Sequence, residues 1–476
     1  MSDPLALLPL ALAAHGGRVD AHEAQQLVAA GLTLLRRTAP LVRALSGARA
    51  AILLPPTPAY LVALAASEGR GAVLVNPLAA PPEIAHQLTD ANVGAVFTVA
   101  ALEPALPPAI PRVLLDEAPA RALYVHGSER RTVDLGSHVG LTLEGEADVP
   151  GREEEAVIVY TSAMAGTPLG AILTHRNILA NARAAVAATG TTAADHALAL
   201  LPIAHLFGFT ITLVAPLLAG ARVSTMARFD PARVLRVVEE SRITMLVGVP
   251  AMYRAMLGAL ALGGERLRAP ALRLCICGGA PLEPALQEQW LDATGVDLRQ
   301  GYGLTEAGPA CLFNAVSHPN RIGSLGTPFP GVRVTIRDEH GTEAARGVEG
   351  EICVAGESIF AGYLSGGDAG LQRHHEWLRT GDLGVMDDDG AVTFRGVRKA
   401  MFTRNGFNIY PREIERAVRE LPGVLRATVR TRPTGHLEHD IVLDVTGTVS
   451  ADDVARWCRA RLAAYKQPAE VYVSSA

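Results

Sequence analysis

A loop of small, hydroxyl-bearing and proline residues separates two apolar runs, and its composition is typical of an anion-binding turn. We predict a buried strand over Ala156–Tyr160, a turn over Thr161–Gly170 and a second strand over Ala171–Leu173. Backbone N–H groups of such a turn, aided by the Thr161 and Ser162 hydroxyls, can surround a phosphate. The loop lacks the lysine and the glycine spacing of a Walker A sequence, so it is not a P-loop.

This loop resembles the phosphate loop of the acyl-adenylate-forming superfamily, which includes acyl-CoA synthetases, stand-alone adenylation domains and luciferases. The superfamily pattern YTSGTTGxPKG corresponds to YTSAMAGTPLG at Tyr160–Gly170. The resemblance implies that Thr161, Ser162 and Gly166 lie against the nucleotide phosphates. Several positions depart from the pattern, and the substituted residues are Ala163, Met164, Ala165 and, in place of the phosphate-facing lysine, Leu169.

The strongest resemblance is QGYGLTE at Gln300–Glu306, which contains the superfamily signature YGxTE without a substitution. It implies that Tyr302 stacks on adenine, that the Thr305 hydroxyl meets the α-phosphate and that Glu306 holds Mg²⁺. The chemistry agrees, because a hard dication prefers carboxylate oxygen beside phosphate. The GGAPL turn resembles the wall of the adenine site, which implies nucleotide contacts by Gly279, Ala280 and Pro281.

By the same resemblance, three further residues are each expected to have a function. LPIAHLFGF implies that His205 lines the acyl pocket and gates ATP entry, and WLRTGD implies that Asp382 binds the ribose diol. One carboxylate can accept both hydroxyl hydrogens. Lys399 falls on the hinge about which a small C-terminal lid rotates between adenylation and thioester formation. His205 could also be an ordinary core histidine, and Asp382 could be an ordinary acid in a surface turn. The flanking matches favour the functional interpretation of both residues.

Other cationic positions of the superfamily are not kept. The ribose-contacting arginine aligns with Val397, and Arg398, one residue along the strand, is expected to point to the opposite face. We find no counterpart of the glycine-rich C-terminal segment that carries a catalytic lysine. Lys466 aligns with the earlier lysine of the YKxP pattern, for which we expect no catalytic role.

The apolar segment around His205 also indicates the kind of acid. Relatives that activate amino acids carry an aspartate there, because a desolvated ammonium group needs a counter-charge. No acidic residue lies between Ala197 and Arg222. We therefore expect a small-molecule carboxylic acid without an α-amino group, either a fatty or an aryl acid.

The elements that must position these residues alternate between strand and helix. Strands over Ala50–Leu54, Ala72–Asn76 and Val93–Thr98, with helices over Pro58–Glu68 and Pro82–Ala91 between them, predict a parallel, helix-covered sheet. The fold class is therefore α/β, with a large N-terminal domain of several subdomains, residues 1–394. A small mobile α+β lid, residues 395–476, follows.

Composition excludes several other classes of protein. The 476 residues are 49% hydrophobic and 19% charged, which is ordinary for a globular chain of two or more domains. A net charge of −5 without basic runs excludes a broad nucleic-acid surface. The five cysteines contain no CxxC pair, and we expect a cytoplasmic protein without a membrane span.

Two functional hypotheses follow. The first is an acid–thiol ligase that uses ATP and Mg²⁺ to form acyl-AMP and passes the acyl group to coenzyme A or to a phosphopantetheinyl carrier protein. The second is a degenerate relative, either a pseudoenzyme or a protein that takes a preformed acyl donor without efficient adenylation. The missing lysines favour the second hypothesis for the adenylation step alone. The oligomeric state stays open.

Overall fold

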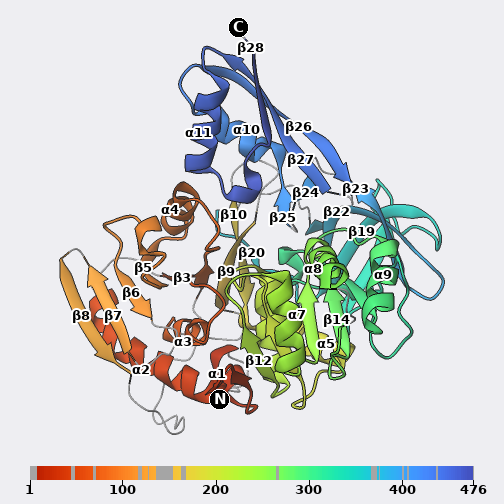
Figure 1. Ribbon diagram of the computed structural model, residues 1–476, viewed down its shortest axis with the longest axis horizontal. Coiled ribbons are helices and arrows are strands. Elements are labelled where there is room, and N and C mark those ends of the chain that lie inside the picture. Colours follow the sequence, from red (N-terminus) through yellow and green to blue (C-terminus); the bar gives the residue numbers. More distant parts are fainter. Residues whose placement is uncertain are drawn as a thin grey trace.

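A computed structural model describes residues 8–43, 49–67, 71–115, 121–126, 128–135, 154–161, 168–263, 267–365, 373–374, 376–398, 401–404, 407–435 and 438–474. The N-terminal part forms two large sheets and a smaller one, and the C-terminal part lies above them in Figure 1.

The first sheet has nine strands, and its centre is the parallel arrangement that the alternation of strand and helix predicts. In spatial order its strands are β20 (Gly362–Tyr363), β10 (Leu169–Thr174), β9 (Glu155–Thr161), β4 (Ala72–Leu74), β3 (Arg49–Leu53), β5 (Val93–Thr98), β6 (Arg112–Leu115), β7 (Arg121–His126) and β8 (Glu129–Asp134). The run from β9 to β6 is parallel, whereas β10, β20, β7 and β8 pair antiparallel at the two edges. The predicted strands around Ala50–Leu54, Ala72–Asn76 and Val93–Thr98 therefore pair in parallel as expected, and hairpins and a distant segment extend the sheet at its edges.

The second sheet also has nine strands and is parallel in its centre. In spatial order they are β17 (Thr327–Pro328), β16 (Leu312–Phe313), β15 (Leu298–Tyr302), β14 (Leu274–Cys277), β13 (Met245–Gly248), β11 (His196–Ala199), β12 (Arg222–Thr225), β1 (Arg18–Val19) and β2 (His22–Glu23). A third sheet is antiparallel and contains β18 (Val332–Arg337), β19 (Glu349–Gly356), β22 (Trp377–Met386), β21 (Arg373–His374) and β23 (Val392–Val397).

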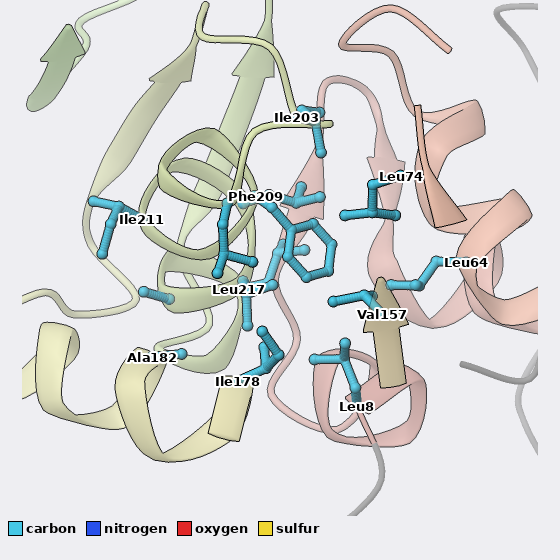
Figure 2. Close-up of a cluster of buried hydrophobic side chains, with 14 of the residues drawn as sticks. Leu8, Leu64, Leu74, Val157, Ile178, Ala182, Ile203, Phe209, Ile211 and Leu217 are labelled. Atoms are coloured by element: carbon cyan, nitrogen blue, oxygen red, sulfur yellow. The ribbon is translucent and has the colours of Figure 1, made fainter. Parts of the chain in front are cut away.

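Helices that contribute to one shared apolar core pack between the two large sheets. They are α1 (Leu8–Ala13), α2 (Ala24–Arg43), α3 (Ala59–Ala66), α5 (His175–Thr189), the π-helical turn η3 (Gly208–Val214) and α6 (Ala215–Leu218). Every residue of α3 is buried, as expected for a helix that is apolar all round. Figure 2 shows Leu8, Leu64, Val157, Ile178 and Phe209 meeting in this core. The segment Ala197–Gly220 is therefore mostly buried core, split into a strand, a loop and helical turns.

A separate apolar cluster covers the other face of the second sheet. Helices α7 (Pro231–Glu240), α8 (Pro250–Gly263) and α9 (Pro284–Thr294) place Val234, Tyr253 and Trp290 against the strands there. On the first sheet, α4 (Pro81–Asp90) begins with a proline, which suits the first turn of a helix. In the same turn Glu83 Oε2 accepts the Ala80 N–H at 2.7 Å.

Residues 401–474 form a small α+β unit with its own core, which we call the lid. It consists of the hairpin β24 (Phe402–Arg404) and β25 (Phe407–Ile409), the sheet β26 (Val424–Gly435), β27 (Glu438–Gly447) and β28 (Glu470–Ser474), and the helices α10 (Pro411–Arg419) and α11 (Ala451–Arg461). Helix α11 contacts α4 (Figure 1). The boundary between residues 394 and 395 stays a prediction, since β23 pairs with β22 as far as Val397.

Candidate active site

A cavity of about 430 Å³ lies between the lid and the N-terminal sheets, and it brings together most of the residues chosen from the sequence. The predicted residues that line it are Thr161, His205, Gly279, Ala280, Pro281, Tyr302, Thr305, Glu306 and Asp382. The lid contributes Phe402, Phe407, Tyr410, His439, Tyr465 and Lys466 to its wall. Ser162, Gly166 and Lys399 lie outside the described residues.

Tyr302, at the end of β15, is joined directly to Asp382 on β22. The Tyr302 hydroxyl donates to Asp382 Oδ2 at 2.6 Å, and burial, with the Asp382 charge, raises the pKa of Tyr302 well above its usual range. The loop that follows needs glycine, because a Cβ on Gly303 would stand 1.9 Å from the Pro309 carbonyl oxygen. The loop therefore fixes an aromatic ring and a carboxylate at one end of the cavity.

Glu306 is a buried carboxylate, 5% exposed, in the short helix η4 (Thr305–Ala307). Its Oε1 accepts the Tyr363 hydroxyl at 2.7 Å, and among the described residues we find no hydrogen bond to Oε2. The described residues hold no group of three acidic, histidine or cysteine side chains placed to bind a metal ion. A single carboxylate still fits Mg²⁺, since this ion is usually held by one or two carboxylates together with substrate phosphates.

His205 stands between this cavity and a smaller apolar one. Its Nδ1 accepts the Phe207 N–H at 3.3 Å. The side chain is exposed because it lines both cavities. Burial lowers the pKa of His205. At neutral pH the imidazole is therefore uncharged, with the proton assigned to Nε2, where it can donate into the cavity.

The smaller cavity has a volume of about 60 Å³ and an apolar wall. Its lining includes Ala185, Phe207, Ile211 and Phe313, and none of its described residues has a charged side chain. The Phe207 ring closes it on one side, at 3.1 Å from the point where a Cβ on Gly278 would lie.

Positive charge is scarce around the large cavity. Thr161 pairs with Leu169 at the turn end of the β9–β10 hairpin, so an aliphatic residue occupies the position of the missing lysine. Among the described residues, Lys466 is the one lysine or arginine in the lining, beside the carboxylates of Glu83, Glu306 and Asp382. The cavity therefore meets phosphate groups with little positive charge of its own.

The structure confirms the expected orientation of Arg398. Val397 lies opposite Asp382 in the β22–β23 pair and lines the cavity. Arg398 is absent from the lining, and its Nη1 lies 3.7 Å from Glu351 Oε2, a carboxylate that Arg379 also binds. Arg398 therefore does not replace the ribose-contacting arginine.

Sequence reasoning missed two residues of the site. Tyr363 reaches Glu306 because β20 pairs with β10 across nearly two hundred residues of sequence, and no local pattern marks that pairing. Lys466 was given no role, yet it is in the cavity wall. Its rarity was a usable signal, since the chain contains only two lysines.

Comparison with known proteins agrees with this geometry. The family described as AMP-binding enzyme matches residues 39–364. A feruloyl-CoA synthase from Amycolatopsis sp is 32% identical over 92% of this chain and 88% of its own length. A long-chain-fatty-acid–CoA ligase from Bacillus subtilis (strain 168) is 28% identical over 89% and 81%. The solved structure of a malonyl-CoA ligase, a ternary product complex with methylmalonyl-CoA and AMP bound, is 28% identical, with a TM-score of 0.78 over 99% of both chains.

A two-sheet α/β fold with a lid-covered cavity of this kind defines an ATP-dependent acid–thiol ligase-like enzyme. The chain belongs to the AMP-binding enzyme family. The comparisons give no support to the pseudoenzyme hypothesis. Within the described residues, no helix is both long and apolar enough to cross a bilayer.

Proposed function

We propose that this enzyme activates a carboxylic acid without an α-amino group as acyl-AMP and transfers the acyl group to coenzyme A. In the first step a carboxylate oxygen attacks the α-phosphorus of ATP, and pyrophosphate leaves. In the second step the thiol sulfur attacks the acyl carbon, the bond to phosphate breaks, and AMP leaves with the electron pair. The observation that carries the proposal is the meeting of Tyr302, Thr305, Glu306 and Asp382 beside an apolar pocket in one cavity.

Each residue has a role in this scheme. Tyr302 and the turn Gly279–Pro281 would hold adenine, and Asp382 would accept the ribose hydroxyls. Thr305 would donate to the α-phosphate. Glu306 would hold Mg²⁺, whose charge stabilises the charge that develops on phosphorus. The neutral His205 would orient the acyl carboxylate from the edge of the apolar pocket.

The names of the relatives support coenzyme A as the thiol, and a phosphopantetheinyl carrier protein is the alternative acceptor. All five cysteines are buried and unpaired, which supports a reducing, cytoplasmic compartment. The direct test is incubation with ATP, Mg²⁺, coenzyme A and a panel of acids. We expect AMP and acyl-CoA in equal amounts; formation of ADP, or thioester from amino acids alone, would overturn the proposal.

We further propose that the lid is in the arrangement that serves thioester formation. The hairpin β24–β25, Tyr410 and His439 face the cavity from the lid. The overall likeness to a complex that contains both products of this step supports the assignment.

Acyl size supplies one prediction. A cavity of about 150 Å³ can hold benzene, so the apolar pocket of about 60 Å³ accepts only a short acyl group while the Phe207 ring stays in place. A longer fatty or aryl acid requires that ring to move. Phe207→Ala should therefore shift the preferred chain by two to four carbons, measured as kcat/KM over a series of straight-chain acids. Leu262→Ala, on the surface at 92% exposure, is the control; the same preference in both variants would contradict the assignment.

Nucleotide affinity supplies a second prediction. Because Val397 faces the cavity opposite Asp382, Val397→Arg should restore one charged hydrogen bond to a bound nucleotide, worth about 1.5 kcal/mol or more. AMP binding should tighten roughly tenfold, as measured by calorimetric titration. Arg398→Ala is the matched control and should leave AMP affinity unchanged. Loss of AMP binding in the control, without gain in Val397→Arg, would mean that Arg398 is the ribose contact after all.

A further inference from the structure

One buried lysine joins the lid to the N-terminal part of the chain. Lys466 Nζ lies 2.6 Å from Glu83 Oε1 on α4 and 2.5 Å from Glu413 Oε1 on α10. Lys466 is 5% exposed and Glu413 is 7% exposed. We call these three residues the lid latch, since one carboxylate belongs to the N-terminal domain and the lysine and the other carboxylate belong to the lid.

The latch is held in place from the N-terminal side. Glu83 Oε2 accepts the Ala80 N–H, so both oxygens of this carboxylate are engaged and its position is set by the first turn of α4. When the lid leaves α4, Lys466 and Glu83 lose their contact with each other, and water must take its place. A substitution that removes Lys466 would instead leave the Glu413 charge buried without its partner, which is strongly destabilising.

The charges of the latch explain why we assign Lys466 no direct role in the chemistry. Burial alone would lower the pKa of Lys466, but the carboxylates of Glu413 and Glu83 raise it well above its usual range. Burial raises the pKa of Glu413 even with Lys466 beside it. The ammonium group therefore stays charged, and two carboxylates already use that charge before any phosphate enters the cavity.

The lid side of the latch is tied to the hairpin that faces the cavity. The Tyr465 ring stacks on Phe407 with centroids 4.0 Å apart and an interplanar angle of 11°. Arg404 Nη1 donates to the Gln467 carbonyl at 2.6 Å. The short helix η5 (Ala464–Lys466) and the hairpin β24–β25 therefore move together, and docking Lys466 on α4 sets where the hairpin meets the cavity.

We propose that Lys466 is a positioning residue for thioester formation: it latches the lid to Glu83 so that the hairpin β24–β25 stays over the acyl-AMP. This inference rests on the proposed function. The latch must open whenever the lid turns to another arrangement, so it biases the enzyme toward the second step and away from the first.

The test separates the two half-reactions and adds a readout that needs no activity. In Lys466→Met, thioester formation from chemically prepared acyl-AMP and coenzyme A should fall at least tenfold under single-turnover conditions. Formation of acyl-AMP from acid and ATP should stay unchanged or rise. Amide hydrogen exchange in Pro81–Asp90 should quicken, because α4 loses its contact with the docked lid. Glu83→Gln should act in the same direction but less, and Lys466→Arg should recover part of the rate.

Arg461→Met is the matched control, since it removes an exposed pair with Glu420 inside the lid. It should match the parent in all three measurements. An equal fall of both half-reactions in Lys466→Met, or unchanged exchange in Pro81–Asp90, would overturn the latch. If the parent enzyme forms no thioester from any acyl-AMP, the proposed function fails, while the exchange measurement still decides for or against the latch.

Discussion

Glu306→Gln should lower acyl-AMP formation by roughly 10²–10³, the usual effect of removing one preorganised electrostatic contact. Glutamine keeps the size of the side chain and can still accept the Tyr363 hydroxyl, which lies 2.7 Å from Oε1. It removes the negative charge that, under the proposed function, would hold Mg²⁺ against the phosphates. The rate is measured with radiolabelled ATP in a single turnover, at saturating acid and Mg²⁺.

Tyr363→Phe is the control for this substitution. It removes the hydrogen bond to Glu306 and leaves the carboxylate, so we expect a fall of about tenfold or less, in line with the net worth of one hydrogen bond. AMP affinity without Mg²⁺ should be similar in both variants and the parent. A Glu306→Gln rate within a factor of three of the parent would mean that another group holds the metal ion.

Thioester should form at least a hundredfold faster from preformed acyl-AMP and coenzyme A than from acid, ATP and coenzyme A. The first step lacks the phosphate-loop lysine, replaced by Leu169, and the described lining supplies only Lys466, which two carboxylates already bind. Each missing cation costs roughly 10²–10³ in rate, although such losses do not add simply. The second step requires none of the missing cations, and its rate is measured by chromatography of the thioester.

Leu169→Lys should reduce the difference in rate between the two steps. It should raise pyrophosphate exchange by about one to two orders of magnitude and leave thioester formation from acyl-AMP unchanged. Ile172→Val, on the same strand, is a control for disturbance of β10. Exchange in the parent as fast as the thioester step would contradict this prediction, and would mean that the part of the loop outside the described residues compensates for the lysine.

The sequence predicted the local elements well because hydrophobic periodicity and turn residues mark them. Strands β3, β5 and β9 lie within one residue of their predicted limits, and the period of two along β23 placed Arg398 on the face away from the cavity. The Gln300–Glu306 loop was identifiable because its glycines and its ligating side chains are contiguous.

What could not be predicted depends on contacts between segments far apart in the chain. Tyr363 meets Glu306 only through the pairing of β20 with β10, and Lys466 meets Glu83 only when the lid docks on α4. Neither contact leaves a periodic pattern. The size of the apolar pocket was equally hidden, because it depends on the position of the Phe207 ring beside Gly278.

The most direct test of the central claim is a crystal structure with a non-hydrolysable acyl-adenylate mimic, an acyl sulfamoyl adenosine. We expect adenine between Tyr302 and the Gly279–Pro281 turn, the ribose hydroxyls on Asp382, and the acyl chain beside Phe207. A mimic bound elsewhere, or no binding at millimolar concentration, would contradict the assignment of this cavity as the acyl-adenylate site.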